Sequence, residues 1–289
     1  MNRTLRARLG VTVAVLAVGS LLLVWMFQRQ DHGQYSAADI SAAADGTAVQ
    51  RAADLRVFFA HQSVGDDLVS EIPAVYAAAE VTSPEVIEVS GDPREGSAVP
   101  SSDEGFFAHT RIGENGDPIG KLEEFDAWMR AGMADRVDVA FIKLCYVDLT
   151  GDTDADAVFK RYNQTLASLE RDYPDVTFVV VTTPLSTEPE LKTRIKGLLG
   201  RDHPAPKSNA VRQRFNELLR EQYGTRVFDV AAFQSTAPDG SRIRGTVDGQ
   251  EYFALYDGHA RDQGHLNDTA SAVAAARLMT FLADATAPD

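Results

Sequence analysis

The sequence predicts an α/β fold with one mostly parallel sheet, and two kinds of segment point to it. From Leu55 onward, short apolar runs rich in Val and Phe alternate with amphipathic segments of helical length. Runs of this composition are typical of strands buried on both faces of a parallel sheet. Strands that alternate with helices indicate βαβ units with right-handed crossovers. The chain shows no internal repeat, so we expect a single domain over residues 53–289.

The N-terminal 28 residues have the pattern of a membrane anchor. Three arginines precede an uncharged run over residues 9–28, which is about the 20 residues that a helix needs to cross a bilayer. Apolar residues continue to the end of this run, and no Ala-x-Ala site follows closely. Residues 1–28 are therefore predicted to be an uncleaved signal anchor rather than a cleaved signal peptide. The arginines predict a single-pass protein of the cell membrane with an extracytoplasmic domain.

Residues 29–52 are mostly polar or small and predict a tether. The predicted strands of the following domain are Leu55–Ala60, Val86–Val89, Val137–Tyr146, Thr177–Thr182 and Arg226–Val230. Apolar residues at a spacing of 3.6 predict four helices, and we interpret each apolar face as the core side of its helix. These faces are Leu122, Phe125, Trp128 and Met129; Val158, Phe159, Tyr162, Leu166 and Leu169; Val211, Phe215, Leu218, Leu219 and Tyr223; and Ala274, Leu278, Phe281 and Leu282.

Two stretches depart from this alternation. Residues 233–258 are rich in Gly, Asp and aromatic residues and predict a loop or hairpin before the last helix. Residues 184–208 carry several basic side chains in an otherwise acidic protein. We interpret this second stretch as a solvated surface excursion. A lid, or a contact to an anionic substrate, is the alternative.

Composition excludes several classes of function. The chain has 289 residues and a net charge of −14, which argues against nucleic acid as a partner because phosphate binding needs a basic face. The single Cys145 excludes an intrachain disulfide framework and a multi-cysteine zinc site. It is predicted to be a buried small residue, because a catalytic thiol would need an activating neighbour that the sequence does not show. The acidic stretch at 152–156 lacks the glycine and glutamate of a calcium loop, and we predict no metal and no cofactor.

A small nucleophilic side chain follows the first predicted strand. Ser63, in the segment His61-Gln62-Ser63-Val64-Gly65, comes after the apolar run and precedes an amphipathic segment. It is therefore expected at the C-terminal end of a strand and the start of a helix, where ligands of open α/β sheets bind. Free N–H groups and the helix dipole favour a developing oxyanion there. Helix capping is the alternative role of Ser63.

A serine nucleophile needs a base to take its proton and a third group to orient that base. Asp262 and His265 lie after the last predicted strand and before the last helix, which is the same sheet edge as Ser63. Histidine transfers protons near neutral pH. An aspartate three residues earlier can hold its other ring nitrogen. The alternative for His265 is an ordinary surface or core histidine.

With these two motifs the chain resembles the SGNH, or GDSL-type, hydrolases. The segment around Ser63 is similar to the nucleophile block, although the Gly-Asp-Ser-Leu sequence is absent, and Asp262-Gln263-Gly264-His265 fits the Asp-x-x-His block. The resemblance covers most of residues 55–285 as an order of elements. It implies a flavodoxin-like three-layer α/β/α sandwich. It also implies Ser63 as nucleophile, His265 as base and Asp262 as orienting acid.

The family further has an oxyanion-hole glycine and asparagine after its second and third strands. The candidates here are Gly113, Asn115, Gly116 and Asp148. An ionised aspartate cannot donate a hydrogen bond to an oxyanion. Either Asn115 or backbone N–H groups would therefore stabilise the oxyanion, or Asp148 has another role. His61 and His259 are candidates for a structural or substrate-contacting role rather than a catalytic one, and His109 is placed near the site by the second loop.

The resemblance implies a serine esterase that acts on O-acyl carbohydrates, such as O-acetylated polysaccharides. An O-acetyltransferase is the near alternative, because the same acyl-enzyme can pass its acyl group to a sugar hydroxyl. A non-catalytic carbohydrate-binding protein with the same fold is the third possibility. The expected partners are an ester substrate, either a small molecule or a polysaccharide, and the membrane through the N-terminal anchor.

Overall fold

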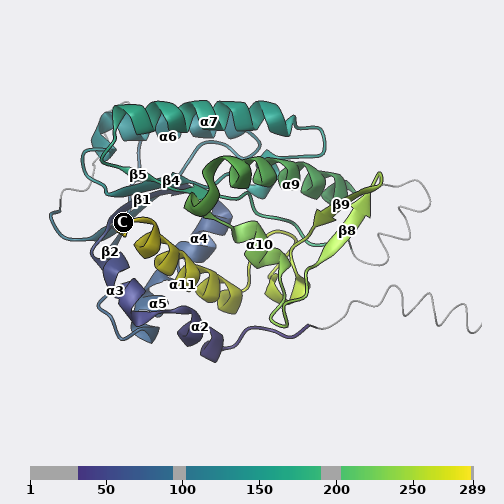
Figure 1. Cartoon of the computed structure of the whole chain (residues 1–289), viewed down its shortest axis with the longest axis horizontal. Helices are drawn as coiled ribbons and strands as arrows, with labels where there is room; N and C mark the ends of the chain where they lie inside the picture. Colours follow the sequence, from purple (N-terminus) through teal and green to yellow (C-terminus); the bar gives the residue numbers. More distant parts are fainter. Residues whose placement is uncertain (1–31, 94–101, 190–202, 288–289) are drawn as a thin grey trace, which may run out of the picture.

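The structure is a parallel sheet with helices on both faces, which confirms the predicted α/β/α architecture (Figure 1). The computed structural model describes residues 32–93, 102–189 and 203–287. The predicted signal anchor, residues 1–28, lies outside these ranges. Within them, no helix combines the length and the apolarity that a bilayer crossing requires.

The central sheet is built from parallel strands in the order β2-β3-β1-β4-β5. Their bounds are β1 (Arg56–His61), β2 (Glu85–Glu88), β3 (Phe106–Arg111), β4 (Val139–Ile142) and β5 (Thr177–Phe178). Val179 alone separates β5 from β6 (Val180–Val181), and β6 pairs in parallel with β7 (Val227–Phe228), so the sheet continues there. Without the edge strand β2, this is the strand order of a flavodoxin-like sheet.

Strand β3 is a strand of the central sheet that the sequence does not predict. Only its first three residues are apolar, and His109, Thr110 and Arg111 follow them. In the structure all its residues except Arg111 are buried, because β3 lies between β2 and β1. Its polar side chains find partners inside the protein, and His109 contacts His61 of β1. A hydropathy pattern cannot show such a pairing between distant strands.

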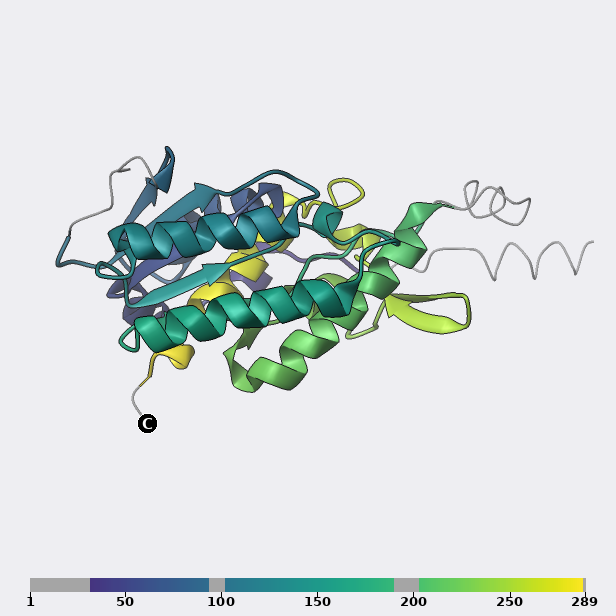
Figure 2. The same ribbon diagram turned by 90° about the horizontal axis from the view of Figure 1, so that it is seen from above.

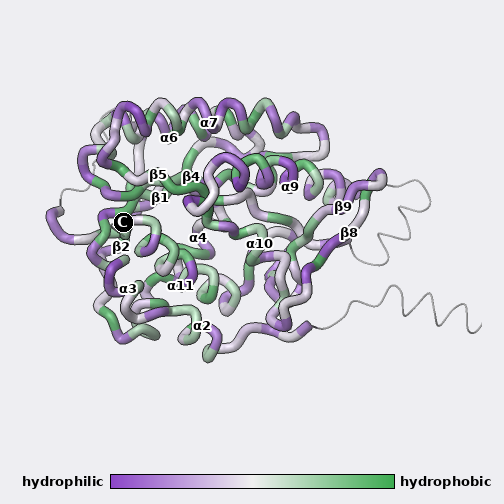
Figure 3. The backbone as a smooth tube through the Cα atoms, in the orientation of Figure 1, coloured by the Kyte–Doolittle hydropathy of each residue, from purple (hydrophilic) through white to green (hydrophobic). Residues whose placement is uncertain are grey.

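One face of the sheet is covered by three long helices, which Figure 2 shows side by side. They are α6 (Pro118–Trp128), α7 (Ala155–Asp172) and α9 (Pro204–Tyr223). Phe125, Tyr162 and Phe215 of these helices pack on Phe58 and its neighbours in the strands. The central strands are hydrophobic, whereas α7 alternates hydrophilic and hydrophobic residues (Figure 3). The predicted apolar faces of these helices therefore do face the core.

The opposite face is covered by a second set of helices. They are α3 (Gly46–Ala53), α4 (Ser63–Val69), α5 (Ile72–Ala78), α10 (Val230–Ser235) and α11 (Asp268–Ala285), with α2 (Ala37–Ala43) against α11. Val57 and Phe59 of β1 point to this side, whereas Phe58 and Ala60 point to the other. This alternation follows from the pleat of a strand. Short helical turns also occur in the described residues, namely η2 (Met129–Met133), η3 (Tyr146–Asp148), η4 (Gly224–Arg226) and η5 (Asp257–His259).

The predicted tether over residues 29–52 is wrong for the part that the structure describes. Residues 37–53 form α2 and α3, and both helices pack against α11. Val49 of α3 is fully buried in the core of this side. The Ala-rich composition that suggested a flexible linker instead allows the helices to approach α11 closely. The folded domain therefore begins before residue 53.

The predictions for the two irregular stretches, residues 233–258 and 184–208, have different outcomes. The hairpin predicted within residues 233–258 is present as the antiparallel pair β8 (Arg244–Val247) and β9 (Gln250–Phe253). Of the basic stretch 184–208, residues 190–202 lie outside the described ranges. Its two flanks are described, and Ser186 and Ser208 in these flanks are buried rather than solvated.

Candidate active site

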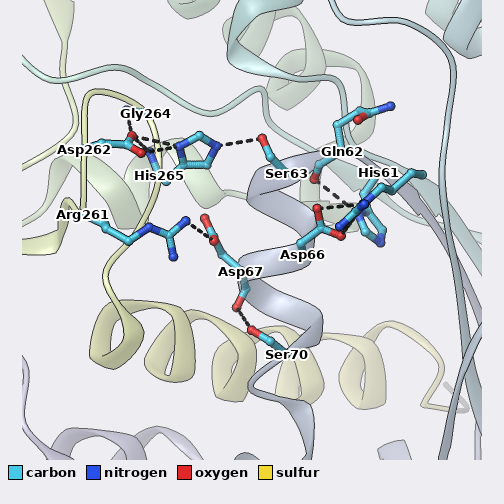
Figure 4. A network of polar contacts seen from close by, with 11 residues as sticks. His61, Gln62, Ser63, Asp66, Asp67, Ser70, Arg261, Asp262, Gly264 and His265 are labelled. Carbon is cyan, nitrogen blue, oxygen red and sulfur yellow. Dashed lines mark hydrogen bonds and ion pairs between the residues drawn. The ribbon is translucent and has the colours of Figure 1, made fainter.

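Ser63 is the first residue of α4, directly beyond the C-terminal end of β1 (Figure 4). This is the position that the sequence predicts. The N-cap of the helix is Gln62, so the alternative role of Ser63 as a capping residue is wrong. A Cβ on Gly65 would collide with the ring of His61. Glycine at this position therefore lets the helix start immediately after the strand and present the serine at the sheet edge.

Ser63, His265 and Asp262 form a continuous chain of hydrogen bonds, although they lie at opposite ends of the domain sequence. The Nε2 atom of His265 lies 2.8 Å from Ser63 Oγ, and its Nδ1 atom lies 2.8 Å from both carboxylate oxygens of Asp262 (Figure 4). An ionised carboxylate only accepts, so Nδ1–H is the donor and Nε2 is left to accept the serine proton. The arrangement is that of a nucleophile, a base and an orienting acid.

The backbone of the last loop fixes the carboxylate of this chain. The N–H groups of Gly264 and His265 donate to Asp262 Oδ1 at 2.9 and 3.0 Å. Burial opposes ionisation of Asp262, but these bonds and the imidazole outweigh it and hold the pKa of Asp262 below its ordinary value. The ring of Tyr146 lies edge-on to His265 and would collide with a Cβ on Gly264. The glycine inside the Asp-x-x-His motif is thus required by Tyr146.

An ion pair between residues that were not predicted to belong to the site joins this loop to α4. Arg261 donates from Nη2 to Asp67 Oδ1 at 2.9 Å (Figure 4). Arg261 is the neighbour of Asp262, and Asp67 lies one helical turn after Ser63 in α4. The pair therefore connects the segment that carries His265 to the helix that carries Ser63. The signal in the sequence was a cation directly beside the predicted acid.

Asp148, an oxyanion-hole candidate from the sequence, has a different role. Its carboxylate accepts from Lys121 Nζ at 2.7 Å, from the Gly116 N–H at 2.8 Å and from the Cys145 N–H at 2.6 Å. The side chains of Asp148 and Lys121 are both fully buried. Asp148 accepts all of these bonds, and an ionised carboxylate has no hydrogen to donate to an oxyanion. The prediction is wrong because this carboxylate joins the loops after β3 and β4.

The remaining candidates in the loop after β3 differ in whether their donors are already used in hydrogen bonds. The N–H of Gly113 donates to Glu124 Oε2 at 3.1 Å, and the N–H of Gly116 is used by Asp148. Neither N–H is therefore free for an oxyanion. Asn115 is exposed, and its Oδ1 accepts from Lys121 Nζ at 3.1 Å. This contact orients the amide and leaves its NH₂ group as a donor.

His61 is buried beneath the nucleophile rather than placed in the site. Its Nε2 atom lies 3.0 Å from His109 Nδ1, and its Nδ1 atom lies 3.2 Å from the backbone oxygen of Gln62. Burial lowers the pKa of His61 to about 3 and also lowers the pKa of His109. Both imidazoles are neutral at pH 7 and support the strand ends. The substrate-contact prediction for His61 is therefore wrong.

The neutral His61 is expected to make the fold sensitive to acid. The unfolded chain binds a proton near the ordinary pKa of 6.5, whereas the folded protein does so only near 3. The contribution of neutral His61 to the free energy of unfolding is complete above pH 6.5 and is lost as the pH falls toward 3. Between pH 7 and 5, urea denaturation should show the free energy of unfolding falling by roughly 2 kcal/mol more in the wild type than in His61→Phe. Equal falls in the two proteins would contradict this assignment.

His259 is also a structural residue. Its Nε2 atom contacts the backbone oxygen of Thr236 at 2.9 Å, and its ring stacks on Tyr35 with centroids 4.6 Å apart. Burial lowers its pKa, so it is held neutral. It is fully enclosed by aromatic residues. The substrate-contact prediction for His259 is therefore wrong as well.

A cleft of about 640 Å³ opens beside the triad. Of Ser63, His265 and Asp262, it is Asp262 that lines the cleft, together with Tyr146, and Ser208 and Arg212 of α9 line another side. Cys145, the residue before Tyr146, is buried, as predicted. Within the described ranges, no group of three His, Cys, Asp or Glu side chains is placed to hold a metal ion.

No model of a known protein family matches the sequence, and no curated protein matches it. Among the solved structures that match, a protein from Streptococcus pneumonia named for platelet activating factor is 15% identical. The alignment covers 92% of this chain and 97% of that one, with a TM-score of 0.43. A peptidoglycan O-acetylesterase is 8% identical over 88% of this chain and 98% of its own, with a TM-score of 0.47. Likeness at this level carries no conclusion about activity, so the function is inferred from the geometry of the site.

Proposed function

We propose that the protein is an extracytoplasmic serine esterase that acts on O-acyl carbohydrates. The observation that carries the proposal is the hydrogen-bonded chain from Ser63 through His265 to Asp262, with 2.8 Å at each contact. Such a chain is what nucleophilic acyl transfer requires. The N-terminal sequence supports the location, and the resemblance of the two motifs to SGNH hydrolases supports the carbohydrate ester.

The reaction proceeds through a covalent acyl-enzyme. Ser63 Oγ attacks the ester carbonyl while His265 Nε2 takes the hydroxyl proton, and Asp262 stabilises the imidazolium. The tetrahedral intermediate collapses, its C–O bond to the sugar breaks, and His265 returns the proton to the sugar oxygen. Water then attacks the acyl-enzyme with His265 as base, which releases the carboxylic acid and restores Ser63.

Two groups are available to stabilise the oxyanion. Ser63 and Val64 begin α4, and their N–H groups have no acceptor four residues earlier in the helix, whereas the Gly65 N–H donates to the Gln62 oxygen at 2.5 Å. The NH₂ group of Asn115 is the side-chain donor in the adjacent loop. Each preorganised donor of this kind typically changes kcat by about 10²- to 10³-fold.

A substrate screen tests this function. The wild type is expected to release acetate from acetylated polysaccharides and from 4-nitrophenyl acetate. A fluorophosphonate should label Ser63, as measured by mass spectrometry of the tryptic peptide. Addition of a sugar acceptor separates the alternatives, because an O-acetyltransferase would form acetylated sugar in place of free acetate. Absence of both turnover and labelling would contradict the proposal and favour a carbohydrate-binding protein.

A further inference from the structure

We propose that the cleft beside the triad holds a subsite for a carboxylate group of the substrate, built on Arg212 and Ser208 of α9. This inference rests on the proposed function and narrows it to esters that also carry a negative charge. An O-acylated acidic sugar has that chemistry. The proposal is supported by the contacts of Arg212, by its missing counter-ion and by the polar groups next to it.

Arg212 is buried at the wall of the cleft, with 4% of its surface exposed. Its Nε donates to the backbone oxygens of Tyr146 and Leu149 at 2.7 and 3.1 Å. Its Nη1 donates to Ser186 Oγ at 2.9 Å and to Asn209 Oδ1 at 2.6 Å. These four bonds fix the plane of the guanidinium. Among the described residues nothing accepts a bond from Nη2, which is the donor left for a ligand in the cleft.

No carboxylate neutralises this guanidinium within the described part of the chain. Its four acceptors are neutral oxygens, and the centroid of the Tyr146 ring lies 5.6 Å from its central carbon. Burial lowers the pKa of Arg212 to about 10, so the group keeps its charge at neutral pH. A buried charge without a partner is costly. An anionic ligand would supply that partner.

Further donors lie on the same side of the cleft. Ser208 precedes Arg212 by one helical turn, is 4% exposed and also lines the cleft. Its hydroxyl makes no hydrogen bond with any described residue and can donate to the same ligand. His203, Pro204 and Ala205, which begin α9, border the cleft as well. The positive end of a 20-residue helix therefore faces the space that the anion would occupy.

Acidic side chains also border the cleft and limit where the anion can lie. Asp262 belongs to the triad and pairs with His265, while Glu188 and Asp257 have interactions of their own. Arg261 is held by Asp67. The only side of the described cleft with an uncompensated positive charge is therefore that of α9. We place the carboxylate there, with the ester group toward Ser63.

Matched aryl acetates test the charge preference. 3- and 4-acetoxybenzoate have the shape of the corresponding acetoxybenzamides and differ from them in charge. The wild type is expected to show a kcat/KM for one of the two benzoates about 10- to 100-fold above that for its amide. In Arg212→Gln this ratio should fall to about one. The ratio compares two substrates on the same protein, so a general loss of folded enzyme cancels.

Two control variants complete the test. Arg214→Gln removes an exposed arginine two residues further along α9, which pairs with Asp156, and should leave the ratio unchanged. Arg212→Lys keeps the charge and should keep part of the preference. 4-Acetoxyphenyl phosphate tests whether the subsite binds a phosphate instead. A preference for it over the benzoates would overturn the assignment to a carboxylate.

A binding measurement separates this inference from the proposed function. Calorimetry on Ser63→Ala with the same acetoxybenzoates and acetoxybenzamides requires no turnover. Tighter binding of the benzoate, lost when Arg212→Gln is added, supports the subsite even if the wild type hydrolyses neither ester. Equal binding of benzoate and amide, or a preference that survives Arg212→Gln, overturns the subsite while leaving esterase activity intact.

Discussion

Ser63→Ala is expected to lower kcat for ester hydrolysis by about 10⁴-fold or more, because the nucleophile and its base act as one unit. The fold should be unchanged, since Gln62 and not Ser63 is the N-cap of α4 and the Ser63 hydroxyl bonds to His265. His265→Ala should have an effect of similar size, and the double variant should be little worse than either single one. Initial rates with 4-nitrophenyl acetate measure all three.

Ser70→Ala is the matched control for this experiment. Ser70 ends the same helix, and its hydroxyl donates to the backbone oxygen of Asp67 at 3.1 Å, away from His265 (Figure 4). Its removal should leave kcat within a factor of about two, as expected for a surface change outside the site. If Ser63→Ala kept more than a tenth of the wild-type rate, Ser63 would not be the nucleophile.

Asp148→Asn is expected to lower the free energy of unfolding by about 3–5 kcal/mol, because it leaves the buried ammonium of Lys121 without a counter-charge. The side chains of both residues are inaccessible to solvent. The amide also has one acceptor oxygen for donors that come from Lys121, Gly116 and Cys145. Urea denaturation at pH 7 measures the loss.

Asp152→Asn provides the comparison for Asp148. Asp152 is an exposed aspartate in the turn just after η3, so its change should stay within about 0.5 kcal/mol. The double variant Lys121→Met, Asp148→Leu removes both charges and should lose less stability than the sum of the single changes. Additive losses would show that the two groups do not stabilise one another.

The fold was predictable wherever the hydropathy pattern of a segment matched its environment. The apolar stripe of α7 and the continuous apolar run of β4 are both read from neighbouring residues. Strand β3 and helix α3 were not predictable in this way. His109 and Thr110 of β3 are buried because the strand lies between β2 and β1, where His109 contacts His61. Helix α3 forms in a segment of tether-like composition because Val49 packs in the core beside α11. In both cases the stabilising partner is distant in the sequence.

Two lysines that stand next to apolar residues in the sequence, Lys143 and Lys121, are buried in the structure and were not among the predicted site residues. Lys143 interrupts an apolar run and is fully buried directly after β4, where burial lowers its pKa. Lys121 lies on the inner side of α6 and binds Asp148. Lysine is rarely fully buried without a partner, and of these two only Lys121 has one, since Lys143 Nζ makes no hydrogen bond with any described residue. The identity of that partner depends on which loops meet at the sheet edge.

The sequence by itself determined the α/β alternation and indicated that Ser63, His265 and Asp262 would meet, as their hydrogen bonds show. Local periodicity shows where strands and helices alternate along the chain, and parallel strands bring their C-terminal ends, with Ser63 and His265, to one edge. Only the tertiary structure decided what Asp148 and Arg212 do. The role of a carboxylate or guanidinium depends on which charges and donors surround it after burial, and Asp148 met Lys121 while Arg212 met neutral oxygens.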